Sequence, residues 1–153
     1  MKNIKTTILV LFLLSLVSCT STKTALFDQY SYQKTTELKV ETSNLIDKAT
    51  TSYSANKIQI DKLLLDVEKL VEYEKNKPNN EITFAMWTIL NDKEKNLLAG
   101  FFKLWEEKDK LSATFSQEAK KQVIEAFDLL IQYEVKKDKE SANLLLSLIN
   151  SQK

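Results

Sequence analysis

The sequence predicts an all-α fold, an antiparallel bundle of helices, and three observations support this. The 153-residue chain contains one glycine and one proline, which argues against many strands joined by tight turns. Apolar residues recur at spacings of three and four over several segments, as in helices with one buried face. Short polar connections separate these segments. Helices of this kind bury one another best as an antiparallel bundle.

The first predicted element is a long N-terminal helix that ends near residue 75, and it contains neither glycine nor proline. Polar and β-branched residues at positions 50–54 allow a bend or break, so residues 25–75 form either one helix or two. Lys77-Pro78-Asn79-Asn80 predicts the loop that follows, because proline disfavours helical geometry in the residue before it. The second half of this element carries one apolar stripe, formed by Ile60, Leu63, Leu64, Val67, Leu70 and Val71.

A short segment at residues 81–90 is apolar on nearly all sides. Asn91 with Glu94 resembles a capping box and predicts that the next helix begins there. This helix is expected to end near residues 108–110. The side chains of its apolar stripe are Leu97, Leu98, Phe101, Leu104 and Trp105.

The C-terminal third predicts a further helix with two competing start signals. Thr114 with Gln117 forms a capping box, and Ser112 is an alternative cap. A polar interruption at residues 138–140 precedes a last helical stretch, which either continues the preceding helix or turns away from it.

One short internal similarity links two predicted helices. Residues 70–74 read Leu-Val-Glu-Tyr-Glu, and residues 130–134 read Leu-Ile-Gln-Tyr-Glu. A single five-residue match in helices rich in lysine and glutamate is weak evidence of duplication, so we interpret it as chance.

The composition excludes several classes of function. All 22 basic residues are lysine, and they are interspersed with 21 acidic residues, so we expect no nucleic-acid partner. Arginine is absent, and with it the bidentate grip on phosphates and bases. Histidine is also absent, which removes the commonest general base and transition-metal ligand. We therefore expect no enzymatic activity, no cofactor and no metal site.

The N-terminus carries the most specific motif. Lys2 and Lys5 precede an apolar run from Ile8 to Val17, and Leu16-Val17-Ser18-Cys19 closes it with the only cysteine. This pattern resembles the bacterial lipoprotein signal and its lipobox. The resemblance implies cleavage before Cys19 and a diacylglyceryl group on its sulfur, with further acylation such as palmitate on its amino group.

Three alternatives compete with the lipoprotein interpretation. A transmembrane anchor needs roughly 20 apolar residues, and this run offers ten. An ordinary secretory signal calls for an Ala-x-Ala-like site, which is absent before Cys19. A buried free thiol is the third alternative. Two or three acyl chains hold a protein on a bilayer from which one chain would let it dissociate.

The lipoprotein resemblance sets the expected domain organisation and location. Residues 1–18 are the signal peptide, residues 19–25 the lipidated cysteine and a short tether, and residues 26–150 one α-helical domain. The mature protein is expected to be anchored in the bacterial cell envelope. Thr20 is not the aspartate that retains well-studied lipoproteins at the inner membrane, so we expect the outer membrane.

Two aromatic groups are candidates for core or interface. Phe101 and Trp105 lie on a predicted buried stripe, whereas Trp87 and Phe102 are surplus to one helical face. Burial explains most of these rings. Trp87 and Phe102 are the candidates for protein binding, because aromatic side chains make good interface anchors.

Two carboxylate clusters are candidates for catalysis or cation binding. They are Asp66-Glu68-Glu72 and Glu106-Glu107-Asp109. Catalytic carboxylates need a desolvating cleft, and neither cluster has the spacing of an EF-hand loop. We interpret both as solvated helix faces and assign no catalytic residue.

These observations favour a non-enzymatic adaptor or assembly module that binds an unknown envelope protein. The similarity to small helical envelope lipoproteins, such as secretion-system pilotins, rests on size, helicity and anchoring alone. The alternatives are an immunity-type inhibitor that protects against a toxin and, with less support, a binder of small apolar ligands or a carboxylate-based hydrolase.

Overall fold

The computed structural model describes residues 24–152, and within this range the secondary structure consists of helices joined by loops and turns, with no strand. This confirms the predicted all-α fold. The signal peptide, the lipobox and most of the predicted tether lie outside the described residues. The helices are α2 (Gln29–Ile46), α3 (Tyr53–Lys75), α4 (Glu81–Leu90), α5 (Leu98–Lys108), α6 (Ala113–Lys136) and α7 (Lys139–Ser151).

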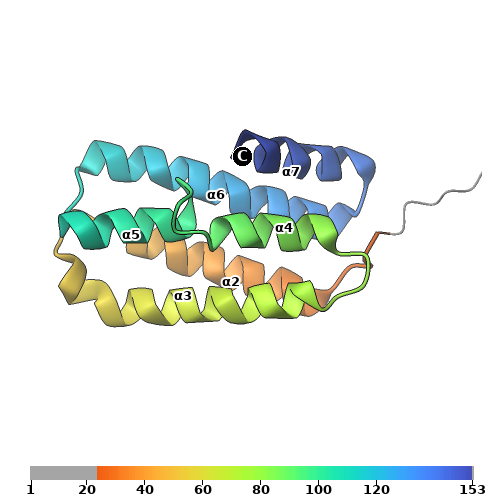
Figure 1. Ribbon diagram of the computed structural model, residues 1–153, viewed down its shortest axis with the longest axis horizontal. Helices are drawn as coiled ribbons and strands as arrows, with labels where there is room; N and C mark the ends of the chain where they lie inside the picture. Colours follow the sequence, from red (N-terminus) through yellow and green to blue (C-terminus); the bar gives the residue numbers. More distant parts are fainter. Residues whose placement is uncertain (1–23, 153) are drawn as a thin grey trace, which may run out of the picture.

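The helices form an antiparallel bundle whose fourth rod is broken (Figure 1). Helices α2, α3 and α6 are long, while α4 and α5 lie end to end beside them. Helix α2 packs against α3 and α6, and α3 also packs against α4 and α5. The last helix, α7, covers α6 and α4. The bundle therefore has two ends, and each is closed by short connections.

We name the two ends for use below. The entry end holds residues 24–28, the loop at 76–80 and the turn at 137–138 (Figure 1). The far end holds the turns at 47–52 and 109–112. The predicted loop Lys77-Pro78-Asn79-Asn80 is confirmed, because α3 ends at Lys75 and α4 begins at Glu81.

Residues 25–75 form two helices, α2 and α3, so the single long N-terminal helix is not confirmed. The break spans residues 47–52 and includes the first three positions of the polar, β-branched stretch at 50–54. Backbone carbonyls of this break bond to other segments instead. The Ala49 carbonyl accepts a hydrogen bond from the Leu111 N–H in the 109–112 turn at 2.8 Å. The Thr51 carbonyl accepts one from the indole N–H of Trp105 in α5 at 3.1 Å. Contacts between distant segments thus replace helical hydrogen bonds at this turn.

The predicted helix start at Asn91 is also wrong. Asn91 is the C-cap of α4, and α5 begins only at Leu98. The Asp92 carboxylate accepts a hydrogen bond from the Glu94 N–H at 2.9 Å, which gives this backbone a local alternative to a helix. The intervening loop carries Leu97 and Leu98 into the core.

The two C-terminal helices begin at side-chain caps. Ser112, rather than Thr114, caps α6, and its hydroxyl accepts a hydrogen bond from the Phe115 N–H at 3.2 Å. Asp138 caps α7 by accepting from the Ser141 N–H at 2.8 Å. Lys137 adopts a left-handed conformation with φ 50°, so α7 turns away from α6.

Aromatic rings from several helices fill the bundle core. Trp87 of α4 meets Phe127 of α6 edge to face with ring centroids 5.7 Å apart. Tyr53 of α3 meets Trp105 of α5 in the same way at 5.8 Å. Such edge-to-face pairs stabilise a core beyond the area they bury. They also fix α4 and α5 against their neighbours, which positions the surface described next.

Candidate functional site

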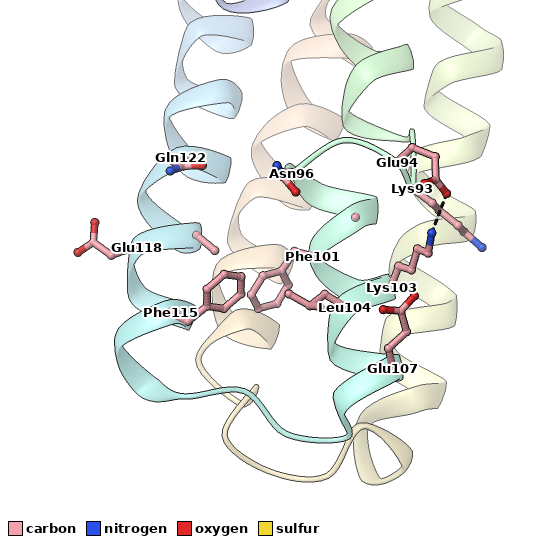
Figure 2. A pocket seen from close by; sticks show the side chains of 12 residues that line it. Lys93, Glu94, Asn96, Phe101, Lys103, Leu104, Glu107, Phe115, Glu118 and Gln122 are labelled. Carbon is pink, nitrogen blue, oxygen red and sulfur yellow. Dashed lines mark hydrogen bonds and ion pairs between the residues drawn. The ribbon is translucent and has the colours of Figure 1, made fainter. Parts of the chain in front are cut away.

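A groove of about 320 Å³ lies between α5 and α6 (Figure 2). Its apolar lining comes from Phe101 and Leu104 of α5 and from Phe115 and Ala119 of α6. Figure 2 shows the rings of Phe101 and Phe115 facing each other, with Leu104 beside them. The groove therefore joins the bundle core to the surface in the half of the molecule near the far end.

The two phenylalanines of the groove differ in exposure. Phe101 is 4 % exposed and belongs to the core, whereas Phe115 is 44 % exposed in the first turn of α6. Their rings are nearly parallel, at 5°, with centroids 6.3 Å apart. Phe115 is thus an aromatic side chain held in place by a buried neighbour, while much of its surface remains in water.

The only glycine of the chain, Gly100, also lines this groove. A Cβ atom at this position would lie 1.8 Å from the carbonyl oxygen of Lys95. That distance is far below van der Waals contact with a backbone atom. Glycine is therefore required here because α5 lies directly against the preceding loop.

Charged side chains of both signs surround the groove. The Lys103 ammonium pairs with Glu94 at 2.7 Å (Figure 2), and Lys121 pairs with Glu118 at 2.7 Å. Glu107 also lines the groove. This mixed rim favours neither an anionic nor a cationic ligand, so the apolar floor is the feature that could select a partner.

A second notable arrangement is a charged network at the entry end, which we call the entry-end network: Asp28, Glu74, Lys77, Glu134 and Lys137. Glu74 is fully buried, and its Oε2 lies 3.2 Å from the Lys77 Nζ. The same nitrogen lies 3.3 Å from Asp28 Oδ2 and 4.0 Å from Glu134 Oε2. The Lys137 Nζ lies 2.7 Å from Glu134 Oε2. Lysines of two loops thus neutralise carboxylates of two helices.

The entry-end network holds the segment that leads into α2. The Asp28 N–H donates to Glu134 Oε1 at 2.6 Å, and the Ala25 N–H donates to the Asn79 carbonyl at 2.9 Å. The Asp28 carboxylate also caps α2 by accepting from the Tyr30 N–H at 2.9 Å. Residues 25–28 are therefore fixed across the end of the bundle.

The similarity between residues 70–74 and 130–134 has a physical counterpart in this network. Both glutamates of the match, Glu74 and Glu134, are buried, and each pairs with a lysine three residues later. Each of those lysines also lies over the ring of the tyrosine before the glutamate. The Lys77–Tyr73 and Lys137–Tyr133 distances from nitrogen to ring centroid are 5.8 and 4.9 Å. The two helix ends are thus built in the same way.

The pKa values of Asp28 and Tyr73, which are hydrogen-bonded to each other in this region, are shifted in opposite directions. Burial raises the pKa of Asp28, but hydrogen bonds from the Tyr73 hydroxyl and the Ser31 N–H, together with the charge of Lys77, outweigh burial and hold it below its ordinary value. The Tyr73 hydroxyl donates to Asp28 Oδ2 at 2.6 Å. This bond, reinforced by burial, raises the pKa of Tyr73 to about 12.

The structure corrects the assignment of Trp87 and Phe102 as protein-binding residues. They are 0 % and 1 % exposed. Helix α4 packs against α3 and α7, α5 packs against α3, and the Trp87 ring also meets Phe127 of α6. Cys19 and the lipobox residues Leu16, Val17 and Ser18 lie outside the described residues. The groove residue missed by sequence reasoning is Phe115, which precedes the apolar stripe of its helix.

The carboxylate clusters lie at the surface. Asp66 pairs with Lys62 at 3.0 Å and with Lys69 at 2.8 Å, which agrees with a solvated helix face. Asp109 has a structural contact that the sequence did not indicate: it accepts hydrogen bonds from the Ser52 hydroxyl at 2.6 Å and the Tyr53 N–H at 3.2 Å, at the start of α3. Within residues 24–152 no three metal-ligating side chains gather into a metal site.

Two further findings complete the description. No helix within residues 24–152 is long and apolar enough to cross a bilayer. No protein-family model, curated protein or solved structure matches the chain.

Proposed function

We propose that the protein is a lipid-anchored component of the bacterial cell envelope that binds another protein through the α5/α6 groove and has no enzymatic activity. The lipobox-like residues Leu16 to Cys19 support the anchor. The short spacing between Cys19 and the fixed segment at residues 25–28 supports a domain held close to a membrane. The outer membrane is the proposed destination.

The observation that carries the binding role is the half-exposed ring of Phe115 stacked on the buried ring of Phe101. Aromatic side chains in well-packed surroundings dominate the energetics of protein interfaces. The groove between two helices suits an apolar or aromatic side chain from a partner segment, as in helix-in-groove recognition. The groove is lined by α5 and the first half of α6, and Figure 1 shows that these segments lie towards the far end of the bundle. This placement would leave the groove accessible with residue 19 anchored.

The alternatives from the sequence receive less support. An inhibitor of a toxin is expected to present a strongly charged groove, whereas this groove has a mixed rim. A binder of small apolar ligands is expected to enclose its ligand, whereas Phe115 is open to water.

Site-specific photo-crosslinking in cells tests the binding role. A benzophenone amino acid at position 115 samples the groove, and the same probe at Ile58 samples a more exposed apolar position of α3 outside it. We expect one envelope protein to crosslink at position 115 and not at position 58. Ala119→Glu, which places a charge in the groove, should abolish the crosslink without unfolding the domain. If positions 115 and 58 capture the same proteins, or if Ala119→Glu leaves the crosslink intact, the groove is not the binding site.

A further inference from the structure

The entry end exposes apolar side chains that the bundle leaves uncovered. Leu26 is 88 % and Phe27 53 % exposed, and both lie in the segment that crosses this end. Tyr30 and Tyr32, in the first turn of α2, are also exposed. The Phe27 and Tyr32 rings lie 6.1 Å apart, and Tyr30 contacts Tyr73 with ring centroids 4.6 Å apart. We call Leu26, Phe27, Tyr30 and Tyr32 the entry-end rim.

The rim is a built surface, because the backbone beneath it is fixed. Ala25 is buried and bonds to Asn79, while Asp28 bonds to Glu134 and caps α2. Leu26 and Phe27 lie between these two fixed points. Their side chains therefore project into water from a held backbone.

The position of the rim along the chain identifies its occupant. Leu26 follows Cys19 by seven residues, a span of at most about 25 Å when fully extended. A diacylated Cys19 thus keeps the rim within reach of the bilayer that holds its acyl chains. Phenylalanine and leucine enter the apolar boundary of a bilayer, and tyrosine places its ring there with its hydroxyl in the headgroup layer.

From this juxtaposition we infer that the entry-end rim is a second membrane contact, inserted in the interface of the bilayer that carries the lipid anchor. The inference rests on the proposed anchoring. Its consequence is an orientation: the entry end faces the membrane, and the α5/α6 groove is directed away from it. The lipid anchor keeps the protein bound to the membrane, and the rim restricts rotation of the domain relative to the bilayer.

The contact is apolar rather than electrostatic. Two lysines at this end, Lys77 and Lys137, are already paired with buried carboxylates of the entry-end network. Lys34 and Lys75 pair with the exposed carboxylates of Glu37 and Glu72. We therefore expect the contact to be the same on neutral and anionic bilayers.

Depth-sensitive fluorescence on the mature lipoprotein, purified from bacterial membranes and reconstituted into phosphatidylcholine vesicles, tests this inference. Leu26→Cys and Ile58→Cys each add one thiol for an environment-sensitive probe, at positions that are 88 % and 86 % exposed. We expect brominated lipids to quench the probe at position 26 several-fold more strongly than the probe at position 58. Adding phosphatidylglycerol should not change the result. Phe27→Ser, a surface change, should reduce quenching at position 26.

The outcomes separate the two proposals. Protein that floats with the vesicles while positions 26 and 58 are quenched alike contradicts the rim contact and leaves the anchor intact. Quenching at position 26 that appears only with anionic lipid overturns the apolar contact. Protein that fails to float with the vesicles overturns the anchor and the rim contact together.

Discussion

The entry end and the α5/α6 groove place the same kinds of residues, charged and aromatic, in opposite ways. At the entry end, Glu74 and Glu134 are buried and neutralised by lysines, so the polar groups lie inside and the apolar rim lies outside. Beside the α5/α6 groove, the charges lie on the surface and the rings of Phe101 and Phe115 run from core to solvent. Buried ion pairs contribute little net stability compared with apolar packing, but they are costly to break. The buried ion pairs therefore fix the conformation of the entry end, whereas the groove leaves an aromatic side chain exposed to solvent.

Lys77→Met should have the largest effect, because it removes the cation shared by three carboxylates of the entry-end network. Methionine keeps the apolar volume but leaves the buried Glu74 without its counter-charge. We expect the free energy of unfolding, measured by urea denaturation, to fall by about 3–5 kcal/mol. Lys57→Met breaks the exposed pair with Asp61 and should have no measurable effect. Equal effects of the two substitutions would contradict the special status of the entry end.

Gly100→Ala should have the next largest effect and tests the groove side of the comparison. The added Cβ would lie 1.8 Å from the Lys95 carbonyl oxygen, so the loop before α5 must move. We expect a loss of about 2–3 kcal/mol in the free energy of unfolding. Asn96→Ala in the same loop, at an exposed position, should change stability by less than about 0.5 kcal/mol. If Gly100→Ala left the free energy of unfolding unchanged, the close contact between α5 and the preceding loop would be contradicted.

Tyr73→Phe should have a smaller effect that depends on pH. The hydrogen bond to Asp28 raises the pKa of Tyr73 from 10.0 to about 12, so its stabilisation is complete below pH 10 and is lost as pH rises towards 12. Because the ring is 39 % exposed, solvent screening reduces the expected difference from wild type to about 1 kcal/mol at pH 8.

Urea denaturation of both proteins at pH 8 and at pH 11.5 measures this difference. It should shrink at the higher pH. Tyr32→Phe, at an exposed position of the same end, should match wild type at both pH values. If the difference between Tyr73→Phe and wild type stayed constant with pH, the hydrogen bond from the Tyr73 hydroxyl to Asp28 would not contribute to stability.

Phe115→Ala should have the smallest effect on stability and the largest on binding. The ring is almost half exposed, so its truncation should reduce the free energy of unfolding by less than about 1 kcal/mol. Co-purification of the partner identified by crosslinking should nevertheless be lost. Leu65→Ala, at a half-exposed position of α3, is the matched control and should leave binding unchanged. Retention of the partner by Phe115→Ala would separate binding from the groove.

Local patterns predicted most of the helices and their loops. The apolar run at 81–90 matches α4, and the loop around Pro78 lies where proline and two asparagines indicated it. Helix starts were less predictable, since neighbouring polar residues compete as caps. Ser112 and Thr114 are both suitable N-caps in the sequence, and only the folded structure shows that Ser112 is the one used.

The candidate site was less predictable because it depends on packing between distant segments. Trp87 and Phe102 are buried by helices far along the chain, which a single helical face does not reveal. The entry-end network joins Lys77 to Glu134 across 57 residues of sequence. The repeated Tyr-Glu pair was the only sequence feature related to this network. The sequence did not indicate that both glutamates of the pair are buried.

The intact mass of the mature protein from bacterial membranes is the decisive measurement, because the proposed location, the rim contact and the orientation of the groove all depend on Cys19. We expect a chain that begins at Cys19 and carries a diacylglyceryl group and further acylation. A chain that retains residues 1–18, or that begins at Cys19 without lipid, would contradict this expectation.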